Sequence, residues 1–270
     1  IFALVALNVT KMILDYKGTS VFYTDEGKGT TLVLLHGFLE NSTMWNAIKP
    51  ELLKRNRIVC IDLLGHGQTE CFGYVHTMDL MAEVVSEVLL HLKIRRSIFV
   101  GHSMGGYVAL AFAEQFPDNV KGLCLLNSTS RADSLERIQL RNRAIEAVKT
   151  NYSNLVRMSI SNLFRPKNRT LFQDEIKAVK KEALKTPLQG YIAAQEGMKI
   201  RFDREALLHF SPYPKLIIMG KKDPVLSYED LIDQIKDTQV EKLELPDGHM
   251  SHIENQQEVI VALQEFVKRC

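Results

Sequence analysis

Ser103 lies at the centre of a pentapeptide whose residue types favour nucleophilic chemistry. Residues 101–105 read Gly-His-Ser-Met-Gly and directly follow the apolar run 97–100. A strand that ends in Gly-x-Ser-x-Gly and turns sharply into a helix forms a nucleophile elbow, which presents a serine hydroxyl at the end of a strand. Glycines suit this turn because the serine backbone is strained and the helix passes close to the strand. We therefore predict that Ser103 is a nucleophile.

An acid that orients the catalytic base is expected in a loop that follows a core strand. Asp223 fits this expectation because it follows closely after the apolar run 215–219. An Asp before a proline, such as Asp223 before Pro224, is also a common turn residue. Asp133 and Asp247 are the competing candidates. We predict Asp223 as the acid.

The base is predicted from two histidines near the C-terminus. His249 follows a glycine in a loop before the last predicted helix, and an imidazole there can take the proton of Ser103 and pass it to the leaving group. His252 lies three residues later, near Glu254, where it is expected to cap or pack the helix. His102 is also expected to pack, because neighbouring residues of a tight turn point in different directions. We predict His249 as the base.

An oxyanion hole requires two backbone N–H groups that point at the developing negative charge. One is expected from Met104, the residue after the nucleophile. The other is expected from residues 36–39 (His-Gly-Phe-Leu), which follow the apolar run 31–35, and Phe38 is the predicted donor. The loss of one such donor typically costs about 3–4 kcal/mol of transition-state stabilisation.

Short apolar runs alternate with longer helical stretches, which is typical of a mostly parallel sheet covered by helices on both faces. Continuously apolar runs predict buried strands, and a more alternating run predicts a strand nearer the edge. The predicted strands are residues 12–16, 20–24, 31–35, 58–61, 97–100, 123–126, 215–219 and 240–245, and the first two form an antiparallel pair. The clearest predicted helices are residues 42–55, 77–92, 104–116 and 256–268.

Residues 130–211 interrupt this alternation, because they contain amphipathic helical sequence and no convincing buried strand. Since they lie between two core strands, we predict a helical lid over the carboxyl ends of the sheet, where open α/β sheets bind ligands. Residues 131–211 contain sixteen Lys and Arg but nine Asp and Glu, a balance that favours an anionic substrate or reflects solvated helix faces. Candidates for an acyl pocket, or for the core of the lid, are Leu155, Met158, Phe164, Tyr191 and Met198.

The overall composition is that of an ordinary globular protein. The 270 residues are 46% hydrophobic and 24% charged, with a net charge of +2, which gives no reason to expect a nucleic-acid partner. Four scattered cysteines without a CxxC pair indicate a reducing compartment, and we predict a cytoplasmic protein. The apolar residues 1–7 are too few to span a membrane and lack the flanks of a signal peptide.

Four segments are predicted along the chain. Residues 1–11 are expected to be an N-terminal extension or a remnant of cloning, and the core is expected to begin near Met12. The core is divided into residues 12–129 and 212–270, and the lid of residues 130–211 is inserted between its two parts.

Taken together, the motifs resemble those of the α/β-hydrolase superfamily, in particular its lidded, esterase-like branch. The resemblance extends from about residue 12 to the C-terminus and rests on residues 36–38, 62–69, 101–106, 220–223 and 248–249. It implies the α/β-hydrolase fold, a catalytic triad of Ser103, His249 and Asp223, and no metal or organic cofactor. The loop 62–69 is expected to be structural.

The predicted function is a serine hydrolase that cleaves small carboxylic esters, thioesters or lactones through an acyl-enzyme. Residues 36–39 and the Ser-Met-Gly-Gly run also resemble the menaquinone-pathway SHCHC synthase, which carries an Arg in the nucleophile helix where this chain has Tyr107. A synthase of that kind, a carbon–carbon bond hydrolase and a small-ligand receptor that retains the triad are the alternatives. The predicted partner is a small ester-like molecule, and the sequence leaves the oligomeric state open.

Overall fold

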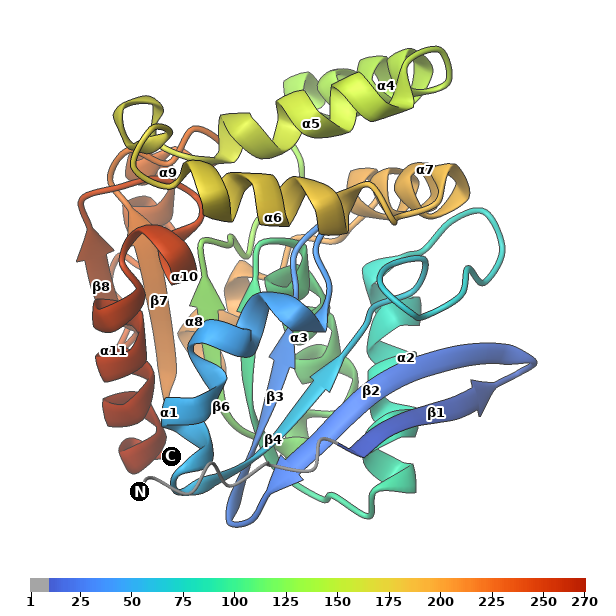
Figure 1. Ribbon diagram of the computed structural model, residues 1–270. Helices are drawn as coiled ribbons and strands as arrows, with labels where there is room; N and C mark the ends of the chain where they lie inside the picture. Colours follow the sequence, from blue (N-terminus) through green and yellow to red (C-terminus); the bar gives the residue numbers. More distant parts are fainter. Residues whose placement is uncertain (1–9) are drawn as a thin grey trace, which may run out of the picture.

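Eight strands form one continuous sheet in the computed structural model, which describes residues 10–270 of the chain (Figure 1). In spatial order the strands are β1-β2-β4-β3-β5-β6-β7-β8. β2 is antiparallel to both β1 and β4, and all other neighbours are parallel. The strands are β1 Thr10–Tyr16, β2 Thr19–Gly27, β3 Thr30–Leu35, β4 Asn56–Ile61, β5 Ser97–His102, β6 Val120–Leu126, β7 Lys215–Gly220 and β8 Glu241–Leu245.

All eight predicted strands are confirmed, and their ends differ from the prediction by at most three residues. β3 to β7 are almost fully buried, because helices cover both faces of the sheet, and this explains their continuously apolar sequence. β8 lies at the edge and is more exposed. β1 begins at Thr10, two residues before the predicted start of the core. Residues 1–9 of the predicted extension lie outside the described residues.

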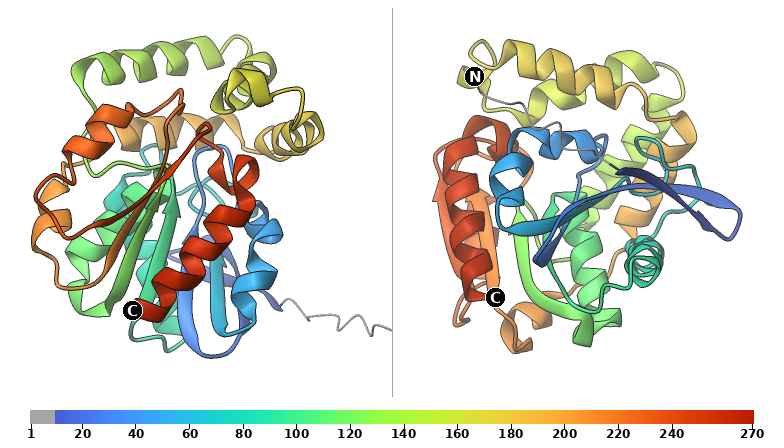
Figure 2. Two further views of the ribbon diagram at one scale, coloured as in Figure 1. Left: turned by 90° about the vertical axis from the view of Figure 1, so that its left-hand side faces the viewer. Right: turned by 60° about the horizontal axis from the view of Figure 1, so that its bottom comes forward.

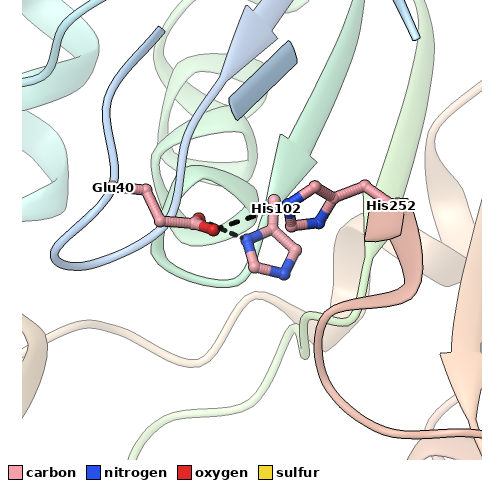
Figure 3. A group of neighbouring side chains, drawn as sticks. All are labelled: Glu40, His102 and His252. Carbon is pink, nitrogen blue, oxygen red and sulfur yellow. Dashed lines mark hydrogen bonds and ion pairs between the residues drawn. The ribbon is translucent and has the colours of Figure 1, made fainter. Parts of the chain in front are cut away.

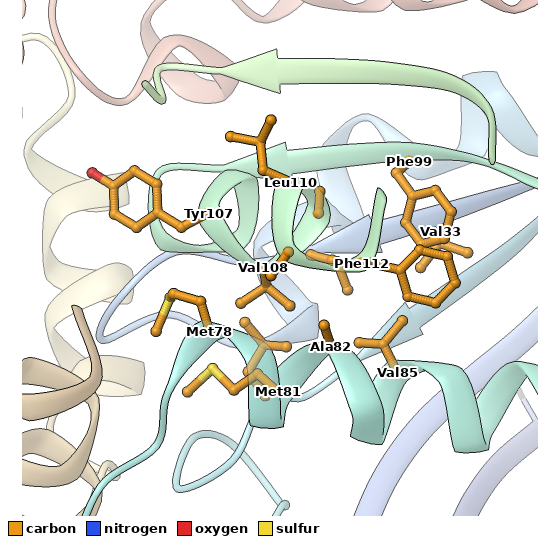
Figure 4. Packing of buried hydrophobic residues seen from close by; sticks show 14 of the residues in the cluster. Val33, Met78, Met81, Ala82, Val85, Phe99, Tyr107, Val108, Leu110 and Phe112 are labelled. Carbon is orange, nitrogen blue, oxygen red and sulfur yellow. The ribbon is translucent and has the colours of Figure 1, made fainter. Parts of the chain in front are cut away.

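Two layers of helices enclose the sheet (Figure 1, Figure 2). α2 and α3 pack on one face, and α1 and α11 on the other. Figure 4 shows Met81 and Val85 of α2 facing Val108 and Phe112 of α3, and the Phe112 ring lies 4.4 Å from that of Phe99 in β5, centroid to centroid. The core helices are α1 Lys49–Leu53, α2 Met78–His91, α3 Met104–Gln115, α9 Tyr228–Asp233, α10 Ser251–Glu254 and α11 Gln256–Arg269, with the short 3-10 turns η1 Ser42–Ala47 and η2 Pro117–Asn119.

Three of the predicted core helices are confirmed as α2, α3 and α11. The predicted single helix over residues 42–55 is wrong, because this segment forms η1 and then the separate helix α1. Pro50 lies in the first turn of α1. A proline has no N–H to donate and clashes with the preceding turn inside a helix, so one helix does not continue through this position.

Five helices lie between β6 and β7 in the sequence. Four of them, α4 to α7, cross the edge of the sheet at which the parallel strands end (Figure 1, Figure 2), whereas α8 packs against α3. The helices are α4 Leu135–Val148, α5 Tyr152–Leu163, α6 Gln173–Ala183, α7 Leu188–Lys199 and α8 Glu205–Phe210, with the 3-10 turn η3 Pro166–Asn168. We call residues 130–211 the helical segment. Within residues 10–270, no helix combines the length and the apolar character that crossing a membrane would require.

The helical segment has a small apolar core of its own. Val156, Ile160 and Phe164 pack there with Tyr191 of α7 and with Leu39 from the loop after β3. Phe164 is fully buried in this cluster, as expected for a residue of the segment's core.

Candidate active site

Ser103 occupies the sharp turn between β5 and α3. Its backbone has φ +50° and ψ −114°, a conformation that costs energy for any residue with a side chain. A Cβ atom on Gly105 would lie 2.2 Å from the backbone oxygen of Leu35, and one on Gly101 would lie 2.4 Å from the Gly105 carbonyl. The turn therefore requires glycine at both positions, which agrees with the prediction from the pentapeptide.

The structure brings the three predicted side chains of Ser103, His249 and Asp223 into one hydrogen-bonded series. Ser103 Oγ lies 2.9 Å from His249 Nε2, and His249 Nδ1 lies 2.7 Å from Asp223 Oδ2. Because a carboxylate only accepts hydrogen bonds, Nδ1 carries the hydrogen, and Nε2 is free to accept the hydroxyl proton of Ser103. This arrangement can activate a serine hydroxyl for attack.

Asp223 is held as a carboxylate by several donors. Its Oδ1 accepts the backbone N–H groups of Val225 and Leu226 at 2.8 and 3.1 Å, and Oδ2 also accepts the Asn127 amide at 3.2 Å. Burial by itself raises the pKa of Asp223, but the neighbouring His249 and the two backbone amides outweigh burial, so the pKa lies below its ordinary value. A carboxylate that stays charged can stabilise an imidazolium formed on His249.

The competing acids lie in other contacts. Asp133 forms ion pairs with Arg141 and Arg201 of the helical segment. Asp247 forms an ion pair with Arg165, at 2.9 Å. Neither carboxylate is among the hydrogen-bond partners of His249.

The predicted oxyanion donors come from the residue after Ser103 and from the loop after β3. Met104 is the first residue of α3, and Phe38 lies in the tight 36–40 loop, in which Leu39 has φ +64°. Within residues 10–270, the amides of Phe38 and Met104 donate to no protein acceptor. The N-terminus of α3 also carries the positive end of the helix dipole, which suits a negative charge.

A cavity of about 480 Å³ opens above Ser103 between the sheet and the helical segment, a volume in the usual range for small-molecule sites. Ser103, His249 and Phe38 form its floor, and Tyr191 and Met198 contribute to its wall. Of the five apolar residues proposed for an acyl pocket, these last two do line it. Met158 does not, because its side chain points to solvent and is 55% exposed.

The wall formed by α4 carries excess positive charge. Arg137 and Arg141 both line the cavity and lie one helical turn apart. Arg141 and Arg201 share the single carboxylate of Asp133, and Arg141 also donates to Gln195 at 2.9 Å. Within the described residues, the Arg137 guanidinium forms neither an ion pair nor a hydrogen bond. The wall can therefore attract an anionic group.

Glu40 is a site residue that the sequence reasoning missed, although it lies only two positions after Phe38. Its carboxylate lies 2.7 Å from His102 Nδ1 and accepts the Gly37 N–H at 2.8 Å. With His252 these side chains form the one group in residues 10–270 whose atoms lie close enough together to share a metal ion. His102 already uses both ring nitrogens, on Glu40 and on the backbone oxygen of His249, so the group is better described as a buried ion pair.

Comparisons with known proteins place the chain among related sequences. The model of the alpha/beta hydrolase fold family matches residues 30–256. The chain is 28% identical over 246 residues to the dihydrolipoyllysine-residue acetyltransferase component of the acetoin cleaving system of Pseudomonas putida, covering 89% of this chain and 64% of that relative. It is 30% identical over 230 residues to 3-oxoadipate enol-lactonase 1 of Acinetobacter baylyi, covering 83% and 84% of the two chains.

The solved structures agree with these sequence matches. A thermophilic esterase from Thermogutta terrifontis, with malate bound, has a TM-score of 0.87 and 28% identity and covers 96% of this chain and 98% of its own. The chain spans less than two thirds of the length of the first curated relatives it matches, 64% in one case and 30% in the next three.

Proposed function

The chain belongs to the α/β-hydrolase fold family, and from this membership we propose that it is a serine hydrolase that cleaves small carboxylic esters or lactones. The observation that carries the proposal is the hydrogen-bonded series from Ser103 Oγ through His249 to Asp223, with contacts of 2.9 and 2.7 Å. The similar proteins named as an esterase and an enol-lactonase support the choice of an ester or lactone bond.

The proposed reaction proceeds through an acyl-enzyme. Ser103 Oγ attacks the substrate carbonyl carbon while His249 Nε2 takes the hydroxyl proton, and the carbonyl oxygen becomes an oxyanion held by the amides of Phe38 and Met104. The C–O bond to the alcohol then breaks, and His249 returns the proton to the leaving oxygen. A water molecule, deprotonated by His249, attacks the acyl carbon in the same way, and the acid leaves as Ser103 regains its proton.

The helical segment is proposed to act as a lid over this site. The core on either side of this lid is proposed to be residues 12–129 and 212–270, the division expected from the sequence. α4, α5 and α7 supply the cavity wall, which includes Ile160, Leu163, Tyr191 and Met198. Such a cover excludes water from the bound ester and selects the acyl group by size.

The substrate is further proposed to carry an anionic group. The α4 wall presents Arg141, which shares Asp133 with Arg201 from the segment after α7, and Arg137, which has no counter-ion among residues 10–270. The similar esterase was solved with malate, a dicarboxylate, and the similar lactonase is named for 3-oxoadipate, which also carries carboxylates. An arginine in this position can bind a carboxylate through paired N–H groups.

A cytoplasmic location remains part of the proposal. The four cysteines are free thiols, and Cys60 and Cys124 are buried in β4 and β6. Free thiols fit a reducing compartment.

The deciding experiment is steady-state hydrolysis of p-nitrophenyl esters from acetate to decanoate, with labelling of Ser103 by a fluorophosphonate. We expect turnover of short esters, and a loss of about 10,000-fold or more in kcat in Ser103→Ala. Ser159→Ala is the matched control, because Ser159 lines the same cavity but is not bonded to His249. Full activity in Ser103→Ala would overturn the proposal. If Ser103 is labelled but no ester is turned over, the substrate class would be wrong and the nucleophile right.

A further inference from the structure

A buried ion pair lies directly behind the proposed catalytic side chains. His102, Glu40 and His252 come from three separate segments, and their side chains meet in one buried group (Figure 3). His102 Nδ1 lies 2.7 Å from Glu40 Oε2, and His102 Nε2 lies 3.0 Å from the backbone oxygen of His249. His102 and Glu40 expose only 1% and 3% of their side chains.

The geometry indicates the charge state of this pair. The backbone oxygen of His249 has no hydrogen to give, so His102 Nε2 must be the donor there. Glu40 Oε2 accepts from the Gly37 amide as well as facing His102 Nδ1, an arrangement that suits a carboxylate and an imidazolium with both nitrogens protonated. Burial by itself lowers the pKa of His102, but Glu40 outweighs it and the pKa is raised. His102 likewise holds the pKa of Glu40 at about 2, against the effect of burial.

The other titratable groups around His102 are accounted for. His36 lies after β3, Asp223 in the loop after β7, His249 in the loop before α10, and His252 within α10. Burial lowers the pKa of His252 to about 3, so this neighbour is neutral at ordinary pH. Within residues 10–270, Glu40 is therefore the one carboxylate in hydrogen-bonding contact with His102.

We propose that His102, as an imidazolium paired with Glu40, is a positioning residue that fixes the proposed nucleophile, base and oxyanion donor relative to one another. The proposal rests on the serine hydrolase function proposed above. His102 precedes Ser103 in the chain, its Nε2 holds the backbone of His249, and its partner Glu40 holds the Gly37 amide next to Phe38. One charged pair thus joins three loops that are far apart in the sequence.

This arrangement predicts a specific dependence on pH. The link is complete only while Glu40 is ionised and His102 is protonated. As pH rises through the raised pKa of His102, the Nδ1 proton is lost and the carboxylate loses its partner. Reactivity of Ser103 should therefore decline on the alkaline side.

The test is the rate at which a fluorophosphonate labels Ser103 in the full chain from pH 5 to pH 10, which requires no knowledge of the substrate. In His102→Gln, the amide can still reach the His249 backbone oxygen but carries no charge for Glu40. We expect labelling to slow by about tenfold to a hundredfold and the alkaline decline to disappear. His252→Gln is the matched control, since His252 Nε2 lies 3.8 Å from Glu40 Oε1, too far for a hydrogen bond, and this variant should label within about twofold of wild type.

The outcomes separate this inference from the proposed function. If wild type is not labelled at Ser103, the proposed function fails, and this inference fails with it. If wild type is labelled and His102→Gln reacts at the same rate with the same alkaline decline, only the positioning role is overturned. His102→Gln leaves the buried Glu40 carboxylate without its partner and could unfold for that reason. In that case the double variant His102→Gln/Glu40→Gln, which removes both charges, is measured instead. An alkaline decline that persists in the double variant would equally overturn the positioning role of His102.

Discussion

The sheet core and the helical segment are held together in different ways. The core buries continuous apolar layers on both faces of the sheet, whereas α4 contributes only Arg141, Ile145 and Val148 as buried residues. Much of the segment's attachment to the core is polar, such as the ion pairs of Arg165 with Asp247 and of Arg204 with Asp79. Since packed apolar layers resist displacement more than exchangeable polar contacts do, the core is suited to fix chemistry and the segment to select the substrate.

The two regions are nevertheless joined at the site. The backbone N–H of His249 donates to the backbone oxygen of Leu163, at the end of α5, at 3.0 Å. Glu254 accepts the N–H groups of Arg165 and Gly248 at 3.0 and 3.1 Å. The helical segment therefore covers the cavity and also supports the loop that carries the proposed base.

The largest effect is expected in the core, at Asp223. Asp223→Asn should lower kcat by about 10,000-fold, because the amide favours the wrong tautomer of His249 and cannot stabilise its charged form. Asp247→Asn is the matched control, since Asp247 lies in the His249 loop but pairs with Arg165, and it should cost less than about tenfold. The reverse order in a kcat measurement would assign the acid to Asp247.

The contrast in packing predicts different losses of stability for two fully buried phenylalanines. Phe99→Ala should lower the free energy of unfolding by about 3–5 kcal/mol, because Phe99 packs in the main core against Phe112. Phe164→Ala should lower it less and should speed proteolysis within residues 130–211, because the segment can open separately.

Urea unfolding followed by limited proteolysis measures both effects. The exposed Met158→Ala should change stability by at most about 0.5 kcal/mol. Equal losses in Phe99→Ala and Phe164→Ala, without faster cleavage of the segment, would show that the two regions unfold as one unit.

Low pH should lower the free energy of unfolding, because the buried carboxylate of Glu40 becomes protonated. Its pKa in the folded protein is about 2, against an ordinary value of 4.5, so the folded state favours the carboxylate. The resulting stability is present above pH 4.5 and is lost as pH falls towards 2, by about 3 kcal/mol. Glu40→Gln should show a shallower decline in the free energy of unfolding between pH 5 and pH 2. If this slope is the same as in wild type, the folded protein does not lower the pKa of Glu40.

The smallest effect is expected in the helical segment, at Arg137. Arg137→Gln should lower kcat/KM for monomethyl esters of dicarboxylic acids by about tenfold to a hundredfold, because one charged contact is lost. Neutral methyl esters of the same length should be almost unaffected, and Arg137→Lys should retain part of the preference. If Arg137→Gln lowers kcat/KM equally for both ester series, Arg137 does not contribute to substrate selection and is only a surface residue of α4.

The sequence predicts local features of this protein well. The Gly-x-Ser-x-Gly pentapeptide predicts the turn at Ser103, since only glycine fits at positions 101 and 105. The order of the motifs predicts that Asp223 and His249 lie beside Ser103, because the carboxyl ends of parallel strands meet at one edge of a sheet. Where local reasoning failed, as in the single helix expected over residues 42–55, the contrary signal was also local, at Pro50.

The sequence by itself determined which strands are buried, where the sharp turn at Ser103 lies, and which loops carry Asp223 and His249. These features depend on neighbouring residues and on the spacing of apolar residues along the chain. Only the tertiary structure decided that Glu40 pairs with His102, that Arg137 has no counter-ion among residues 10–270, and that Met158 faces solvent. These contacts join segments that are distant along the chain. Which charges become partners there depends on how the helices pack, and no local pattern encodes that choice.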